Sequence, residues 1–412
     1  MKINFRKLIT LLAVFVGLTS ACAKSHTYPK APAYVPLPGG EFPIVASYAF
    51  YPPFINETQF RWVREAGFNI LRKSLDSAQI DSCLHLAERN DLYIMVSPWN
   101  ITDVKKVPSI IEKYKDRKAV WGYGVADEPN YSKFALLGKV MKEIETLDPA
   151  HNGYINLLPE VSENWLGVAD YRTYVEDFVE IVNPPFLSFD CYPVRERKNG
   201  NIYIAETFYP TQEIIMEVAK ESERPFWGYV LCNKSPSYPK PREGFLRFQV
   251  FTALGYGAQG LNYFTYLLPD FDRDKGDFSY SPINSKGQRT AVWNMVRNVN
   301  AEVHSLSDVF LGCEVVSVTH TGEKIPEGTV RNVSLPAPFG IIESFGEGVM
   351  VSHLRNGQDE YLLVVNRDVL KKQKVYLSHS EPVTRLYGDG HEQTVTVGNF
   401  TLDAGGYLLL KF

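Results

Sequence analysis

The chain has 412 residues and a net charge of −4, and 45% of its residues are hydrophobic and 22% charged. This composition is typical of a globular protein and excludes a disordered chain, while the near-neutral charge without a basic stripe argues against nucleic-acid binding. The length exceeds what one ordinary core needs, so we expect one large domain and a smaller one.

The first 21 residues have the pattern of a secretory signal peptide. Lys2, Arg6 and Lys7 form a positively charged start, and the apolar run over 8–18 that follows is too short to span a bilayer. The small residues directly before Cys22 are typical of a bacterial lipoprotein cleavage site. We therefore predict removal of residues 1–21 and lipidation of Cys22; the alternative is an ordinary secretory signal with a chance cysteine.

Residues 22–40 contain several prolines and few large apolar side chains. Such a composition predicts an extended tether between the lipidated cysteine and the folded domain. The leader and the tether together predict an exported protein that is lipid-anchored to the bacterial outer membrane, where it faces either the periplasm or the cell surface.

Residues 41–305 alternate between short β-rich runs and amphipathic helical stretches. The predicted strands are 43–51, 69–73, 92–99, 120–126, 153–158, 186–190, 226–231 and 261–266. The predicted helices are 58–66, 80–88, 134–147, 211–221 and 244–254. Eight strands alternating with helices predict a parallel sheet with helical crossovers, and their number favours an α/β fold of the (β/α)8 TIM-barrel type. A doubly wound open sheet is the alternative.

Residues 306–412 have a different sequence pattern, because short β-like runs are separated by turn residues and no convincing helix follows residue 311. The predicted strands are 314–320, 348–354, 360–366, 373–377, 383–387 and 406–412. This pattern predicts a C-terminal antiparallel β-sandwich of roughly 100 residues.

Enzymes built on such barrels place their functional groups where the strands end, at the C-terminal face. The residues at the ends of the predicted strands are acids, amides and aromatic rings, which suit the hydroxyl groups and the apolar faces of sugars. The predicted substrate-binding residues are Trp99, Asn156, Tyr192, Trp227, Tyr229, Asn233, Tyr263 and Tyr266. The alternative for each ring is a place in the core.

Two adjacent carboxylates, Asp127 and Glu128, follow an almost uncharged predicted strand. Pro129 disfavours helix at Glu128 and keeps it extended at the strand end. Partial desolvation beside Asp127 would raise the pKa of Glu128, as a general acid requires. We therefore predict that Glu128 is catalytic and that Asp127 orients or tunes it; an ordinary acidic turn that opens a helix is the alternative.

These segments resemble the large clan of barrel glycoside hydrolases that includes bacterial β-galactosidases. Asp127-Glu128-Pro129 stands where that clan carries its acid/base glutamate, at the end of the fourth strand. The segments 188–193, 253–264 and 298–306 are also similar to the clan's scaffold, and the resemblance covers residues 43–412. It implies a glycosidase that acts on a glycan by carboxylate general acid/base catalysis.

The sequence departs from this clan at the end of the seventh strand, where retaining members carry a nucleophilic glutamate. The segment 226–234 contains no acid. Asp190, at the end of the sixth predicted strand, is the first choice for the second carboxylate, with a structural role as its alternative. Glu160 and Glu163 are lesser candidates. Three interpretations are compatible with this sequence: an inverting enzyme, an enzyme with another nucleophile, or a catalytically inactive carbohydrate-binding lipoprotein.

The remaining motifs predict no cofactor and no metal. The segment 255–260 matches G-x-G-x-x-G, but a helix is predicted before it and a strand after it, so it is interpreted as a turn and not as a dinucleotide site. The histidines and cysteines lack metal-binding spacing. The aspartates in 270–277 are interpreted as a solvated loop, with a calcium loop as the alternative. The expected partners are a carbohydrate and, through the lipid, a membrane.

Overall fold

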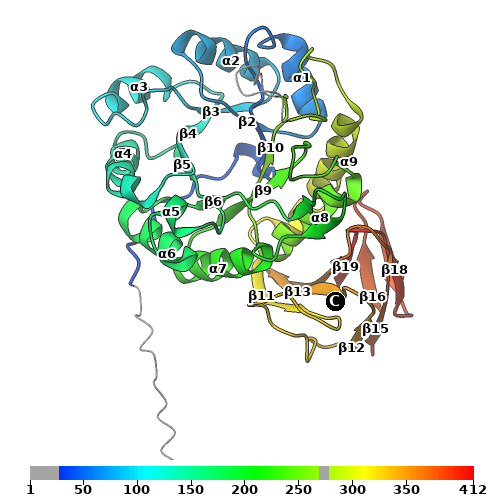
Figure 1. Cartoon of the computed structure of the whole chain (residues 1–412). Coiled ribbons are helices and arrows are strands. Elements are labelled where there is room, and N and C mark those ends of the chain that lie inside the picture. The colour runs from blue at the N-terminus through cyan, green and yellow to red at the C-terminus, as the bar shows by residue number, and fades with distance from the viewer. Residues whose placement is uncertain (1–26, 269–277) are drawn as a thin grey trace, which may run out of the picture.

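A ring of eight parallel strands forms the centre of the larger domain in the computed structural model, which describes residues 27–268 and 278–412 (Figure 1). The strands are β1 (Ile44–Ser47), β2 (Ile70–Arg72), β3 (Tyr93–Val96), β4 (Val120–Asp127), β5 (Asn152–Asn156), β6 (Leu187–Phe189), β9 (Phe226–Leu231) and β10 (Leu261–Phe264). Their order is β5-β4-β3-β2-β1-β10-β9-β6. The edges β5 and β6 are joined because the Leu157 amide donates to the Ser188 carbonyl at 2.8 Å. The barrel prediction is confirmed and the open sheet is excluded.

Helices surround the barrel on its outside (Figure 1). They are α1 (Glu57–Glu65), α2 (Ser77–Arg89), α3 (Val107–Tyr114), α4 (Phe134–Leu147), α5 (Glu163–Leu166), α6 (Tyr171–Val182), α7 (Phe208–Glu221), α8 (Glu243–Gly255), α9 (Ala291–Ser305) and α10 (Ser307–Phe310). Several starts are set by side-chain caps: Asp76 and Gln79 form a capping box at α2, and Asp170 accepts from the Thr173 amide at α6. Helices α3, α5, α6, α9 and α10 were not predicted, although Asp170 is a start signal for α6.

The interior of the barrel is closed at its N-terminal end by an apolar layer. Trp121 and Trp227 stack with ring centroids 4.8 Å apart, and Phe186 lies 4.8 Å from Trp227. Gly260 faces Trp227, and a Cβ there would lie 2.5 Å from the indole ring. The layer is completed by Leu37, Val45, Ile70, Met95 and Tyr154. Polar side chains therefore gather toward the opposite, C-terminal end of the strands.

The segment before β1 packs against this closed end of the barrel. Leu37 is 3% exposed and belongs to the apolar layer. The amide of Val35 donates to Asn152 Oδ1 at 3.0 Å, and Asn152 Nδ2 donates back to the Val35 carbonyl at 2.8 Å. The tether prediction is therefore wrong for the described part of residues 22–40, because Leu37 and Val35 fasten residues 27–40 to the barrel.

The C-terminal domain consists of two antiparallel sheets that share a core, which confirms the sandwich prediction. One sheet has the order β11-β13-β14-β19-β16-β17 and the other β12-β15-β18. The strands are β11 (Glu314–His320), β12 (Phe339–Ser344), β13 (Val349–Asn356), β14 (Asp359–Asn366), β15 (Gln373–His379), β16 (Val383–Leu386), β17 (Glu392–Val395), β18 (Asn399–Leu402) and β19 (Tyr407–Lys411). Strands β12, β17 and β18 were not predicted. A further hairpin, β7 (Val194–Glu196) and β8 (Ile202–Ile204), follows β6.

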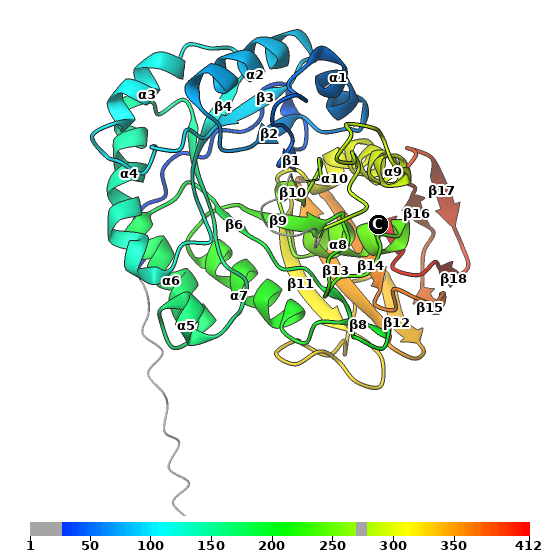
Figure 2. The same cartoon turned by 45° about the horizontal axis from the view of Figure 1, so that its top comes forward.

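The sandwich lies beside α8 and α9 in both views (Figures 1 and 2). Ser352 Oγ on β13 donates to the Gly255 carbonyl at the end of α8, at 2.6 Å. Phe251 of α8 stacks on Tyr407 of β19 with ring centroids 3.5 Å apart. These contacts lie on the outside of the barrel, so the sandwich supports α8 and leaves the C-terminal mouth of the barrel to the loops.

Candidate active site

A hydrogen-bonded polar layer lies between the apolar layer and the C-terminal mouth of the barrel. Tyr154 and Tyr229 pair through their hydroxyls at 2.9 Å, and Arg72 Nη1 donates to Tyr229 Oη at 3.1 Å. Asn262 Nδ2 donates to Tyr154 Oη at 3.2 Å, and Ser47 Oγ donates to Asn262 Oδ1 at 2.7 Å. These side chains come from β1, β2, β5, β9 and β10, so the network spans the barrel and forms a rigid floor for the mouth.

Arg72 joins this floor to the first of the two adjacent carboxylates. Its Nη2 atom lies 3.1 Å from Asp127 Oδ1, and its side chain is 12% exposed against 43% for Asp127. Burial alone would lower the pKa of Arg72, but the carboxylate of Asp127 and the neighbouring phenols outweigh it, so its pKa lies above the ordinary value. The arginine stays charged and fixes the Asp127 carboxylate at the end of β4.

Glu128 stands directly after β4 and is exposed at the mouth. Its backbone has a φ of 47°, in the left-handed region that non-glycine residues rarely adopt, and its amide donates to the Asn156 carbonyl at 2.8 Å. This backbone geometry directs Glu128 toward the end of β6, where its carboxyl is hydrogen-bonded to the carboxyl of Asp190. Such local strain is typical of functional sites.

Asp190 lies beneath Glu128 and is only 8% exposed. Asn156 Nδ2 donates to Asp190 Oδ1 at 3.2 Å, and Ser188 Oγ donates to Asn156 Oδ1 at 3.2 Å, so the amide is held from both sides. The structure thus brings together four predicted site residues, Asp127, Glu128, Asp190 and Asn156.

The pKa values of Glu128 and Asp190 are both raised. For each carboxyl the first cause is burial, and negative charge on its neighbours adds to it: Asp127 acts on Glu128, and Glu128 and Asp127 act on Asp190. The more deeply buried Asp190 has the stronger preference for its proton and donates it to Glu128. Two carboxyls in contact cannot both ionise cheaply, so the pair holds one proton as a unit.

The spacing of this pair differs from that of the two carboxyls that flank a glycosidic bond. Flanking carboxyls stand about 5–5.5 Å apart in retaining enzymes and about 6.5–9.5 Å apart in inverting ones. Glu128 and Asp190 are in hydrogen-bond contact, which leaves no room for a sugar between them. Asp190 is therefore placed to share a proton with Glu128 and not to oppose it across a substrate.

No carboxylate occupies the end of β9. Asn233 follows this strand, is 1% exposed, and neither Oδ1 nor Nδ2 has a hydrogen-bond partner among the described residues. The lesser candidates do not fill the gap: burial and the charge of Glu327 raise the pKa of Glu160, and Glu163 begins helix α5. An unpartnered buried amide of this kind is available to a ligand or to water.

The predicted aromatic residues separate into two groups. Trp99 is 73% exposed at the mouth, Tyr192 is half-buried there against Tyr238 and Phe264, and Tyr229 lies in the floor. The other three rings are fully buried in the core, which corrects their assignment to the cleft: Trp227, Tyr263 and Tyr266. A strand alternates its side chains between the inside and the outside of the barrel, and the sequence did not indicate the depth of each ring.

A cavity of about 250 Å³ opens beside Asp127. Residues from the ends of β1 to β4 line it: Tyr48, Arg72, Lys73, Ser74, Ser97, Trp99, Gly124, Val125, Ala126 and Asp127. Arg72, Lys73 and Tyr48 were missed as site residues. The signal that could have found them is the pair of cations Arg72-Lys73 at the end of the otherwise apolar second strand. These two residues stand at the same place on their strand as the two acids at the end of the fourth strand.

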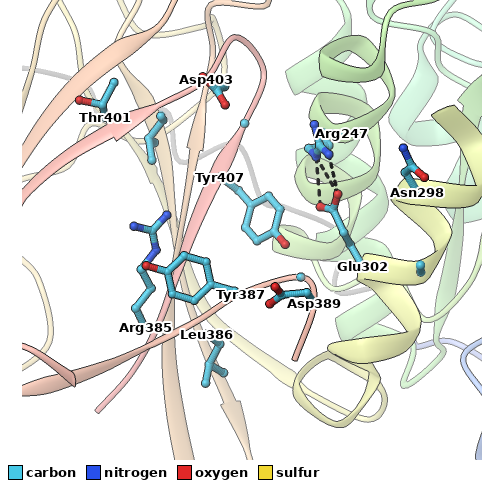
Figure 3. A pocket seen from close by; sticks show the side chains of 14 residues that line it. Arg247, Asn298, Glu302, Arg385, Leu386, Tyr387, Asp389, Thr401, Asp403 and Tyr407 are labelled. Atoms are coloured by element: carbon cyan, nitrogen blue, oxygen red, sulfur yellow. Dashed lines mark hydrogen bonds and ion pairs between the residues drawn. The ribbon is translucent and has the colours of Figure 1, made fainter. Parts of the chain in front are cut away.

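A larger cavity of about 510 Å³ lies between the barrel and the sandwich (Figure 3). Arg247 of α8 points to Glu302 of α9, at 2.6 Å, and pairs also with Glu243 at 2.6 Å. Tyr407 lies next to this ion pair, and Arg385 lies against the ring of Tyr387 at 4.3 Å. The partly buried charges of Arg247, Glu243 and Glu302 compensate one another, so this cavity is a weaker candidate for catalysis than the barrel mouth.

The described residues include no group of three or more side chains suited to hold a metal ion. The acidic stretch 270–277 lies wholly outside the described residues, so neither interpretation of it is tested. Of the described cysteines, Cys83, Cys191 and Cys232 are buried free thiols. The segment 255–260 joins α8 to β10, which confirms that it is a turn. No described helix combines the length and the apolar character that crossing a membrane requires.

No protein-family model matches the sequence, and no curated protein matches it either. Solved structures with a similar fold do exist. A catalytic mutant of a GH42 β-galactosidase from G. stearothermophilus aligns over 91% of this chain and 98% of its own, with 9% identity and a TM-score of 0.61. A family 39 glycoside hydrolase from Bacteroides cellulosilyticus aligns over 92% and 83%, with 10% identity and a TM-score of 0.54. A family 5 glycoside hydrolase from Bacteroides vulgatus aligns over 93% and 94%, with 13% identity and a TM-score of 0.54. The fold is therefore that of TIM-barrel glycoside hydrolases.

Proposed function

We propose that this protein is a glycosidase and that Glu128 is the general acid that protonates the leaving oxygen. The observation that carries the proposal is the carboxyl of Glu128, directly after β4 at the mouth of the barrel, in hydrogen-bond contact with the buried carboxyl of Asp190. A general acid at neutral pH needs a raised pKa, and this pair supplies one by burial and mutual repulsion. The fold shared with known glycoside hydrolases supports the same function.

In this proposal the proton that Asp190 holds shifts along their hydrogen bond to Glu128, and Glu128 passes it to the glycosidic oxygen as the bond to the anomeric carbon breaks. Asp190 supplies this proton to Glu128 and does not touch the substrate itself, which makes it a positioning residue. The second carboxylate at the mouth is then Asp127, which pairs with Arg72 at 3.1 Å and is oriented by it. It is suited to stabilise the positive charge that develops on the sugar or to take a proton from the attacking water. The role first expected for Asp190 as base or nucleophile thus passes to Asp127.

The experiment is hydrolysis of a broad panel of glycans and aryl glycosides. Wild type is compared with Glu128→Gln, Asp190→Asn and Asp127→Asn, and Glu112→Gln on the exposed face of α3 is the matched control. Loss of turnover by orders of magnitude in Glu128→Gln, with the control unaffected, supports the assignment. Full turnover in Glu128→Gln contradicts it.

One observation favours a second function. The end of β9 carries the unpartnered Asn233 where retaining relatives of the clan carry an acid, so the barrel is also compatible with a lipoprotein that binds carbohydrate without cleaving it. Absence of turnover on every substrate, together with measurable glycan binding, supports this alternative. NMR of the product distinguishes retention from inversion if cleavage is found.

We further propose that the protein is exported and anchored by a lipid on Cys22. The support is the leader pattern of the sequence, a charged start and an apolar run before small residues and the cysteine. Metabolic labelling with a fatty acid tests it. Fatty-acid label in wild type and none in Cys22→Ser supports the anchor. Mature wild-type protein that carries no label contradicts it.

A further inference from the structure

The cavity beside Asp127 contains a lysine that has no counter-ion. Lys73 follows β2, and its ammonium lies 4.2 Å from the ring centroid of Tyr48. Within residues 27–268 and 278–412, no carboxylate forms an ion pair with it. Burial, and then the charge of Arg72, lower its pKa, and no acidic group offsets them. A cation that is partly removed from water without a partner is costly, and an anionic ligand would relieve this cost.

The neighbouring charges do not supply that partner. Asp127 lines the same cavity, but its Oδ1 atom is 3.1 Å from Arg72, so the two charges compensate each other. Glu128 and Asp190 share a proton and lie outside the lining of the cavity. Among the described residues, the lining of the cavity therefore has one positive charge without an ion-pair partner, that of Lys73.

The rim of the cavity has the features of a sugar subsite. The indole of Trp99 is 73% exposed and lines the cavity, so its face is accessible to a ligand. The cavity volume of about 250 Å³ is of the size of one sugar ring, and Ser74 and Ser97 contribute hydroxyls to its lining. The ring faces of sugars stack on aromatic side chains, while their hydroxyls need hydrogen-bond partners.

We propose that this cavity is a subsite for an acidic sugar, with Lys73 as the counter-ion of a carboxylate or sulfate group and Trp99 as the stacking platform. The proposal deepens the proposed function, since it names the substrate class of the same barrel mouth. It rests on the proposed function only for the statement that the acidic sugar belongs to a substrate; binding itself does not depend on turnover. The shared chemistry is an anionic oxygen group, and the test distinguishes its two sources.

The experiment measures binding by calorimetry in the Glu128→Gln variant, so that cleavage does not interfere. The probes are a uronic-acid oligosaccharide mixture with its carboxyl-reduced counterpart, and a sulfated oligosaccharide mixture with its desulfated counterpart. We expect tighter binding of one acidic probe than of its neutral counterpart. Lys73→Met should lower that preference roughly tenfold or more, as for the loss of a charge-assisted hydrogen bond. Lys73→Arg should retain most of the preference.

Lys139→Met on the exposed face of α4 is the matched control, because it removes one positive charge away from the mouth. It should leave the preference unchanged. Higher salt should weaken acidic binding in wild type and have less effect in Lys73→Met. If Lys73→Met is unfolded by circular dichroism, Lys73→Arg and the salt dependence carry the test.

The outcomes separate this proposal from the proposed function. Equal binding of every acidic probe and its neutral counterpart, or a preference that Lys73→Met leaves intact, overturns the acidic subsite even if neutral glycans are cleaved. A preference that depends on Lys73 without any turnover in wild type supports the subsite and counts against the glycosidase. Preference for the carboxylate probe alone assigns a uronic acid, and preference for the sulfate probe alone assigns a sulfated sugar.

Discussion

The carboxyl of Asp190, buried at the end of β6, is hydrogen-bonded to the carboxyl of Glu128, exposed at the end of β4. The contact depends on the left-handed backbone of Glu128 and on Asn156, which donates to Asp190 from below at 3.2 Å. One proton is shared between a group that substrate can reach and a group that it cannot. This arrangement stores a proton at the mouth of the barrel at neutral pH.

The charge of Asp127 contributes to the raised pKa of Glu128, so removing that charge should lower it. In Asp127→Asn we expect Glu128 to release its proton at a lower pH than in wild type. Carbon-13 NMR titration of labelled glutamate carboxyls measures this directly. An unchanged or higher midpoint in Asp127→Asn would contradict the electrostatic account. Asp103→Asn, on the exposed loop before α3, is the control.

Asp190→Asn should reduce turnover less than Glu128→Gln does. Glu128 gives up the proton itself, and loss of a general acid costs about 10²–10⁴-fold in rate. Asp190 acts through Glu128, so its loss should shift the pH profile as well as lower kcat. Steady-state kinetics over a range of pH separate the two variants. Identical profiles for wild type and Asp190→Asn would show that Asp190 has a merely structural role.

Two tryptophans should respond in opposite ways to truncation. Trp227 is fully buried in the apolar layer, and Trp227→Ala should lower the free energy of unfolding by about 3–5 kcal/mol. Trp99 is exposed at the mouth, and Trp99→Ala should leave stability nearly unchanged but weaken glycan binding. Urea unfolding and calorimetry measure the two effects. A stable Trp227→Ala would contradict the burial of this ring.

Leu37 should contribute to the stability of the barrel although it precedes the first strand. Its side chain is 3% exposed within the apolar layer, so Leu37→Ala should lower the free energy of unfolding by about 2–3 kcal/mol. Leu370→Ala, at a side chain that is 46% exposed in the sandwich, is the control and should have little effect. Equal unfolding midpoints for both variants would restore the tether interpretation of this segment.

Glu213 on α7 should make the stability of the protein depend on pH. Burial raises its pKa to about 7, while its carboxylate accepts from Tyr256 Oη at 2.8 Å. The folded state therefore holds this proton more tightly than the unfolded state, whose glutamate pKa is about 4.3. Its contribution to stability is fully present below about pH 4.3 and is lost as the pH rises through about 7.

The check is urea unfolding at pH 5 and pH 8. Wild type should lose stability between the two, by about 2 kcal/mol from this group, and Glu213→Gln should lose less. Glu221→Gln, exposed at the end of the same helix, should behave as wild type does. An equal pH dependence in wild type and Glu213→Gln would exclude Glu213 as its source.

The alternation of apolar strands and amphipathic helices was sufficient to predict the barrel, because the period of hydrophobic residues is a local property of the chain. The sandwich was predicted from the same signal, but β12 and β17 leave most of their side chains at least partly exposed and do not alternate, and β18, which does alternate, is only four residues long. Asp127-Glu128-Pro129 was found for a similar reason, since two acids at the end of an uncharged strand are visible without any tertiary information.

The sequence by itself thus determined the eight barrel strands, the second domain and the strand ends at which chemistry is to be expected. Only the tertiary structure decided which of those side chains meet. Glu128 contacts Asp190, and Asp127 pairs with Arg72, across different strands. The environment of Lys73 and the burial of Trp227 likewise depend on residues from several strands. The depth of these side chains in the barrel depends on strand register and on the left-handed backbone of Glu128. Neither feature can be recognised from the periodicity of hydrophobic residues in the sequence.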